Sequence, residues 1–213
     1  TPTDEISGEL TGLETDTLLV QSFPFMGATE RDVKTDTVVA TGGKFAFNVG
    51  DSVPKQVYIY PKPSMQPGPD GRMPMVRTMP VRLVLVPGSP VTVKGTVDDY
   101  VLGGSPVYDD YEAANALLAD YEAQADSIMK MCMEMQKNGV SRDSISIAYE
   151  PMEGIEKAME DARAGYVRQN SGKDAALLVL TEVRDPKTAH ELLESLTEPV
   201  RTGALYTLYD FLK

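Results

Sequence analysis

The sequence predicts an α+β protein, with an antiparallel β-sandwich or barrel-like domain over residues 1–104 and an all-α domain with a long helical hairpin over residues 105–213. Two observations predict this division. Over the first hundred residues apolar and polar side chains alternate with a period near two, which is typical of strands. After Ser105-Pro106, where proline fits the first turn of a helix, the apolar period becomes helical. The 213 residues, 42% of them apolar, suffice for one large or two smaller cores.

Short strands separated by Gly, Pro and Asp turns are expected throughout the first domain, and their even spacing favours a sandwich or barrel. The apolar density of Val57–Tyr60 and Val81–Val86 predicts central strands, and Gly42-Gly43 predicts a hairpin turn. The expected strands are Glu5–Leu10, Thr17–Phe23, Thr35–Thr41, Lys44–Val49, Gln56–Pro61, Val81–Val86, Val91–Gly95 and Tyr100–Leu102.

The segment Pro61–Pro80 interrupts this pattern with six prolines, four methionines and an Asp70-Gly71 turn signal. Because proline cannot donate a hydrogen bond to a strand ladder, we expect a projecting loop or a loose edge hairpin.

After Pro106, apolar residues recur at spacings of three and four and so form one apolar stripe, here called a seam, along a helix. This seam predicts a single helix of about 29 residues and about 43 Å, which is stable only if the seam is buried. The seam comprises Val107, Tyr111, Ala114, Leu118, Tyr121, Ala125, Ile128, Cys132 and Met135. A second seam stays in phase across Pro151, where a kink or a new helix start is expected. It comprises Ile145, Ala148, Met152, Ile155, Met159, Ala162 and Tyr166.

The two seamed helices are joined through Asn138-Gly139, which predicts an antiparallel helical hairpin. Three further helices are expected. One follows Ser171 with Asp174 as a weak capping box, one runs from Asp185-Pro186 through Leu196, and one ends near Leu212.

The net charge of −12 is divided unevenly. Residues 1–104 hold 12 acidic and 9 basic side chains and carry −3, whereas residues 105–213 hold 20 acidic and 11 basic side chains and carry −9. Nucleic-acid affinity comes mostly from basic groups that displace counterions, so no nucleic-acid partner is expected.

The sequence begins Thr1-Pro2-Thr3 without an initiator Met, which suggests a processed or trimmed start from which a signal sequence could have been removed. No apolar run approaches the roughly 20 residues of a membrane-spanning helix, so membrane attachment is expected only through a lipid anchor on that removed N-terminus.

The candidate catalytic residues each favour a structural interpretation. Cys132, the only cysteine, lies on the apolar seam, where a thiol stays protonated and packed. His190, the only histidine, is expected on a solvated helix face, so neither a histidine metal cluster nor a serine hydrolase with a G-x-S-x-G elbow is expected. Gly8 and Gly12 lack the context of a phosphate loop.

The paired carboxylates Asp109-Asp110 and Glu160-Asp161 are predicted to lie on solvated helix faces, because neighbours in sequence do not face the same way on a helix. The methionines form two groups that could in principle bind Cu(I) through their thioethers. The second group is predicted to point to different faces of its helix and to fill gaps instead. The groups are Met65, Met73, Met75 and Met79, and Met129, Met131, Met133 and Met135. We therefore expect no catalytic, cofactor-binding or metal-binding residue and no cofactor.

The order of several short motifs resembles a known family. Ile6-Ser7-Gly8-Glu9-Leu10-Thr11-Gly12-Leu13 is similar to the I-x-G-x-x-x-G-L strand that opens the domain preceding the thioredoxin domain in TlpA/AhpC-TSA-type envelope thiol-disulfide oxidoreductases. The later motifs cover nearly the whole chain. They are Gly43–Phe47, Pro54–Tyr58, Leu85–Gly95, Gly104–Tyr111 and Asn170–Ala176.

The resemblance implies a non-catalytic accessory module in the periplasm or outer envelope of a Gram-negative bacterium. It implies that the module positions, oligomerises or recruits substrate for a thioredoxin-like redox domain, in cis or in trans. In the family the catalytic C-x-x-C follows these helices, and this sequence ends at Lys213, so no catalytic residue is carried over.

Two other classes of function remain open. A stand-alone envelope lipoprotein would bind a glycan, a peptide or a protein partner, with the proline- and methionine-rich loop 61–80 and exposed tyrosines as its binding surface. A structural protein would form homo-oligomers by pairing its long helices between chains.

Overall fold

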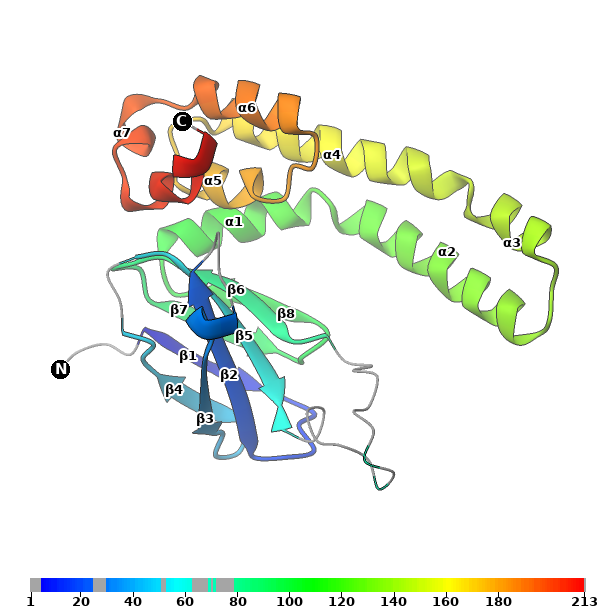
Figure 1. Cartoon of the computed structure of the whole chain (residues 1–213), viewed down its shortest axis with the longest axis horizontal. Coiled ribbons are helices and arrows are strands. Elements are labelled where there is room, and N and C mark those ends of the chain that lie inside the picture. Colours follow the sequence, from blue (N-terminus) through cyan, green and yellow to red (C-terminus); the bar gives the residue numbers. More distant parts are fainter. Residues whose placement is uncertain are drawn as a thin grey trace. The chain divides into compact units, whose positions relative to one another are not determined.

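The computed structural model describes residues 5–24, 30–50, 53–62, 69, 71 and 79–212, and it confirms a mixed α+β protein (Figure 1). Most of the proline- and methionine-rich loop 61–80 lies outside the described residues. The chain forms two compact units. One comprises Thr1–Asp109 with Thr202–Lys213, and the other comprises Asp110–Arg201.

The first unit contains two four-stranded sheets, and all eight predicted strands form within two residues of the predicted bounds. Sheet A has the order β4 (Lys44–Phe47), β1 (Ile6–Leu10), β7 (Val91–Gly95) and β8 (Tyr100–Gly103). Sheet B has the order β3 (Lys34–Val39), β2 (Thr17–Pro24), β5 (Lys55–Pro61) and β6 (Val81–Leu85). Alternate residues of the inner strands are buried, as the period of two predicts.

The expectation of purely antiparallel strands was wrong for one pair. Strands β1 and β7 run parallel, with Ile6 opposite Val91 and Leu10 opposite Gly95. The chain between them passes through all of sheet B, so no tight turn forces the two strands to run in opposite directions.

The turn at Gly42-Gly43 forms, but it does not join two strands of one sheet. Both glycines have positive φ, of 60° and 83°, and the Lys44 N–H donates to the Thr41 carbonyl at 3.1 Å. The Gly43 carbonyl accepts the Leu10 N–H at 2.9 Å, which places β4 beside β1 in sheet A while β3 remains in sheet B. The predicted hairpin is therefore a connection between the two sheets.

Strand β6, predicted to be central, is an edge strand of sheet B. Its apolar side chains are buried on one face, but it pairs only with β5. Two tyrosine hydroxyls occupy its free backbone edge. The Tyr108 hydroxyl accepts a hydrogen bond from the Val86 N–H at 3.0 Å and donates one to the Val84 carbonyl at 2.9 Å. The Tyr100 hydroxyl accepts one from the Arg82 N–H at 2.9 Å and donates one to the Arg82 carbonyl at 3.1 Å. Side chains thus protect an edge that would otherwise be open to pairing with another strand.

The helices follow β8 and the unit boundary lies inside the first of them. They are α1 (Pro106–Ala116), α2 (Ala119–Lys137), α3 (Arg142–Tyr149), α4 (Pro151–Gln169), α5 (Ala175–Leu180), α6 (Pro186–Ser195), α7 (Glu198–Arg201) and the 3-10 helix η3 (Ala204–Leu212), and a short 3-10 turn, η1 (Glu30–Asp32), precedes β3. Asp185 caps α6, with the Thr188 N–H donating to its carboxylate at 2.8 Å. Asp174 makes no side-chain cap bond, so the predicted capping box at α5 was wrong.

The predicted single helix after Pro106 is broken into α1 and α2. At the break the N–H groups of Leu117 and Leu118 donate to the carbonyls three residues earlier, at 3.1 and 2.9 Å, which tightens the backbone into a 3-10 turn. The seam nevertheless stays in phase, because Leu118 is buried and Tyr121 follows three residues later. The spacing of apolar residues did not reveal the break, because the break leaves that spacing unchanged.

The second predicted seam and the helix start at Pro151 are confirmed. Pro151 is the first residue of α4, and every residue of the seam is buried or half-buried. Helix α2 contacts both α3 and α4, which run alongside it in Figure 1 after a turn at Gly139, whose φ is +71°. Outside the seam the side chains of α2 are exposed. None of the described helices is both long and apolar enough to cross a membrane.

This seam predicts a contrast between two isoleucines. Ile155 is buried on the seam, whereas Ile147 is 64% exposed. We expect Ile155→Val to lower the free energy of unfolding by about 1 kcal/mol, because it removes a buried methyl group. The control Ile147→Val should change it by less than about 0.5 kcal/mol. Urea titration of both variants measures the difference, and equal losses would contradict the seam.

Candidate functional site

Cys132 is buried on α2 within the first seam, where the sequence placed it. The neighbouring Met129, Met131 and Met133 are exposed, so their side chains do not converge with the thiol. Among the described residues no group of three or more His, Cys, Asp or Glu side chains could hold a metal ion. Met65, Met73 and Met75 lie outside the described residues.

A buried thiol should react slowly with an alkylating reagent, because the reagent must wait for the helix to open. We therefore expect alkylation of Cys132 at neutral pH to be at least about tenfold slower in the native protein than in urea-unfolded protein. Mass spectrometry over time measures both rates. Equal rates would show that the thiol is accessible in the native protein and would restore Cys132 as a candidate nucleophile.

His190 lies on α6, more than half exposed, 3.5 Å from the Glu194 carboxylate on the next turn. Three members of the acidic pairs Asp109-Asp110 and Glu160-Asp161, which were predicted to be solvated, form ion pairs or hydrogen bonds within the protein. Asp110 forms an ion pair with Lys173 at 3.0 Å, and Asp161 forms one with Lys157 at 2.8 Å. Glu160 accepts the Arg184 and Asp185 N–H groups at 2.8 and 3.1 Å and so fixes the start of α6, a contact that the prediction of a solvated face missed.

A polar cluster that the sequence did not reveal joins α1, α2 and α4 to the residues after α5. Tyr111 donates to the Glu182 carboxylate, whose second oxygen lies 3.4 Å from Nε of the mostly buried Arg163. Burial raises the pKa of Glu122, the Arg163 guanidinium opposes this shift, and Glu182 adds to it. The hollow beside Arg163 has no room for a water molecule. We interpret the cluster as a clamp between helices.

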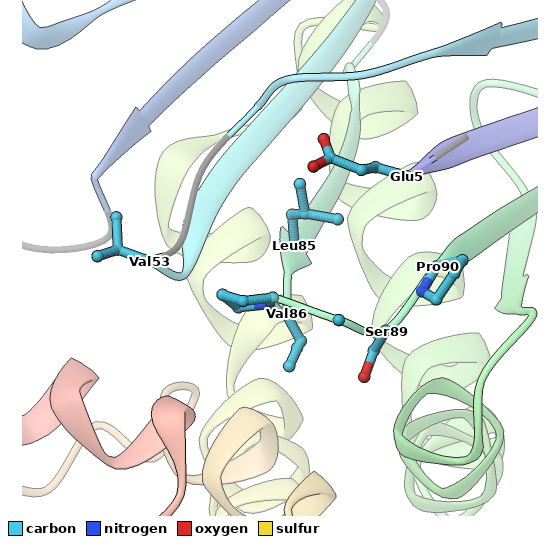
Figure 2. A pocket seen from close by; sticks show the side chains of 8 residues that line it. Glu5, Val53, Leu85, Val86, Ser89 and Pro90 are labelled. Carbon is cyan, nitrogen blue, oxygen red and sulfur yellow. The ribbon is translucent and has the colours of Figure 1, made fainter. Parts of the chain in front are cut away.

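A pocket with room for a ligand lies in the first unit, beside the turn between β6 and β7. Its volume is about 190 Å³, and Glu5, Val53, Leu85 and residues 86–90 line it. Figure 2 shows the Glu5 carboxylate above Leu85, with Val53 to the left and Val86 and Ser89 below. The exposed lining is about equally polar and apolar, and Glu5 contributes the charged group.

Hydrogen bonds within the turn and from neighbouring side chains hold the walls of the pocket in place. In the turn Val86–Ser89 the Ser89 N–H donates to the Val86 carbonyl at 3.0 Å, and Gly88 takes the positive φ, 78°, that a Pro-Gly turn requires. Tyr108 bonds to Val86 before the turn, and the Ser105 hydroxyl donates to the Pro90 carbonyl after it, at 2.6 Å. The pocket is therefore preorganised.

Glu5 is held as firmly as the turn. Its N–H donates to the Asn48 side chain at 2.8 Å, and its carbonyl accepts the Val91 N–H at 2.9 Å. One carboxylate oxygen, Oε2, accepts the N–H groups of Val49 and Gly50 at 2.7 and 3.0 Å. No cation among the described residues forms an ion pair with this carboxylate. The site therefore presents a fixed negative charge at the edge of a pocket whose lining is about half apolar.

Burial raises the pKa of Tyr108 from 10.0 to about 12, and the Val86 N–H opposes this shift. The folded state therefore favours the neutral phenol. Its contribution to stability is complete below pH 10 and is lost as the pH rises through about 12. We expect the phenolate absorbance of the native protein to show a step near pH 12 that the Tyr108→Phe variant lacks. Identical titrations of the two proteins would contradict the burial of this hydroxyl.

The fold and the pocket define a mixed α+β protein of two compact units with a small, rigid pocket in the β-rich unit. No family model, no curated protein and no solved structure matches the chain.

Proposed function

We propose that this chain is a non-catalytic accessory module of an envelope thiol-disulfide oxidoreductase, exported to the periplasm or outer envelope of a Gram-negative bacterium. It positions, oligomerises or recruits substrate for a thioredoxin-like redox domain, in cis or in trans. One observation carries the proposal. The residues that resemble the accessory domain of that family have scaffold roles in sheet A and at its junction with α1.

Two motif glycines illustrate these roles. A Cβ atom on Gly8 would lie 2.4 Å from the Val93 carbonyl oxygen, and a Cβ atom on Gly43 would lie 2.3 Å from the Leu10 carbonyl oxygen. Ser105, from the motif that precedes α1, bonds to Pro90 in the motif that contains β7. Motifs that specify a scaffold support a resemblance in fold, and the buried position of Cys132 supports a non-catalytic role.

We further propose that the two sheets pack face to face as a β-sandwich and that α2 with α3 and α4 forms an antiparallel helical hairpin. The burial of alternate residues in the inner strands supports the sandwich. The two buried seams and the contacts of α2 with α3 and α4 support the hairpin.

The pocket beside Glu5 favours a second candidate, a stand-alone envelope lipoprotein that binds a peptide or protein partner. A preorganised pocket with a fixed charge is typical of a binding surface on a rigid β scaffold. The two candidates differ in whether the module has a redox partner.

The gene around this chain distinguishes the two candidates. We expect the coding sequence to continue into a thioredoxin-like domain with a C-x-x-C motif, or such a domain to be encoded next to it. An in-frame stop without a thioredoxin-like neighbour would contradict the accessory module and leave the stand-alone binding protein.

A further inference from the structure

We propose that the pocket beside Glu5 binds the side chain of a lysine from an extended segment of a partner protein. This inference does not rest on a redox partner, because it uses only the shape, charge and rigidity of the pocket.

The size of the pocket limits its ligand. Its volume of about 190 Å³ is below the roughly 300–1,000 Å³ of sites for drug-sized ligands and cofactors. A pocket of this size has room for one long side chain. The apolar part of its lining, which includes Val53, Leu85, Pro87 and Pro90, suits an aliphatic stem.

The charge of the pocket selects a cation. The carboxylate of Glu5 has no ion-pair partner among the described residues. A side chain with an apolar stem and a positive end therefore fits better than an acidic or purely apolar one.

The geometry of the carboxylate favours lysine over arginine. Arginine binds a carboxylate best through two parallel hydrogen bonds, one to each oxygen. In Glu5 the oxygen Oε2 already accepts the N–H groups of Val49 and Gly50, which leaves Oε1 for a ligand. The ammonium group of lysine is a point charge that needs only one oxygen.

The rigidity of the walls lowers the entropy cost of binding. Tyr108 and Ser105 hold the backbone on both sides of the turn, and two proline rings, Pro87 and Pro90, restrict it further. A ligand therefore does not have to order this loop when it binds.

The test is a titration of ¹⁵N-labelled protein with four short peptides, acetyl-Gly-Ala-X-Ala-amide, in which X is lysine, acetyl-lysine, arginine or norleucine. We expect the lysine peptide to shift the amide signals of Gly88, Ser89, Val49 and Gly50 in a saturable way. Acetyl-lysine keeps the stem but removes the charge, so it should bind about three- to tenfold more weakly. Norleucine should be similarly weak, and arginine should bind no better than lysine.

The variant Glu5→Gln should weaken the lysine peptide about three- to tenfold, while its amide oxygen can still accept the N–H groups of Val49 and Gly50. The matched control is Glu9→Gln, an exposed carboxylate on β1, the strand that directly follows Glu5, and because Glu9 does not line the pocket this variant should leave binding unchanged. The proposal is overturned if acetyl-lysine binds as well as lysine, if arginine binds more tightly, or if no peptide shifts these signals. If Glu5→Gln does not fold, the comparison of lysine with acetyl-lysine on the wild-type protein decides.

Discussion

Replacing Tyr108 with phenylalanine should lower the free energy of unfolding by about 2–6 kcal/mol. Tyr108 is fully buried, and its hydroxyl is the partner of the Val86 N–H and the Val84 carbonyl. Phenylalanine preserves the ring but leaves both backbone groups unpaired in the interior, each at a cost of about 1–3 kcal/mol. The loss should exceed that expected for a tyrosine that bonds to water.

The matched control is Tyr100→Phe. Its hydroxyl bonds to both backbone groups of Arg82 in the same way, but these hydrogen bonds are exposed to solvent. Water can replace the lost hydroxyl there, so the expected loss is at most about 1 kcal/mol. Urea titrations of the two variants measure the difference. Losses of similar size would show that the hydroxyl of Tyr108 does not protect a buried strand edge.

Replacing Gly43 with alanine should lower the free energy of unfolding by about 3 kcal/mol or more. The φ of Gly43 is +83°, and an added Cβ atom would lie 2.3 Å from the Leu10 carbonyl oxygen. The backbone of β1 would have to move, and with it the hydrogen bond from the Leu10 N–H to the Gly43 carbonyl. The contact between β4 and β1 should loosen as a result.

Gly42→Ala is the control for the strain of positive φ alone. The φ of Gly42 is +60°, and an added Cβ atom would meet nothing within 4 Å. We expect a loss of about 1 kcal/mol for this variant. Thermal unfolding of both variants measures the difference. Equal losses would mean that the close approach to Leu10 does not constrain the turn between the sheets.

The sequence predicted the local structure well because local structure depends on periodicity. The period of two gave all eight strands within two residues, and spacings of three and four gave both buried seams, including the helix start at Pro151. The turn residues Gly42 and Gly139 were also identified, because positive φ favours glycine.

Long-range relations were not predictable in the same way. The parallel pairing of β1 with β7 joins segments more than eighty residues apart, and no periodicity encodes it. The high apolar content of Val81–Val86 suggested a central strand, but on one edge its backbone partners are the Tyr100 and Tyr108 hydroxyls from later in the chain. The break at Leu117 was hidden because it leaves the seam in phase.

The pocket and the polar cluster were also missed, for related reasons. Glu5 was one acidic residue in the first predicted strand, and only the fold brings it to the turn Val86–Ser89, more than eighty residues away. Tyr111 and Arg163 come from α1 and α4, and Glu182 comes from the turn after α5. Such clusters have no spacing signature, whereas the scaffold roles of Gly8 and Gly43 coincide with motifs that the sequence did reveal.

The proposed accessory role is tested most directly by the turnover of a disulfide substrate by the thioredoxin-like domain encoded with this chain. The domain should be measured alone, joined to this module, and with the module added separately. We predict that kcat/KM for a protein substrate rises when the module is present, while kcat/KM for a small disulfide is unchanged, because the module supplies positioning or recruitment and no chemistry. Equal kcat/KM values for the protein substrate in all three preparations would contradict the account.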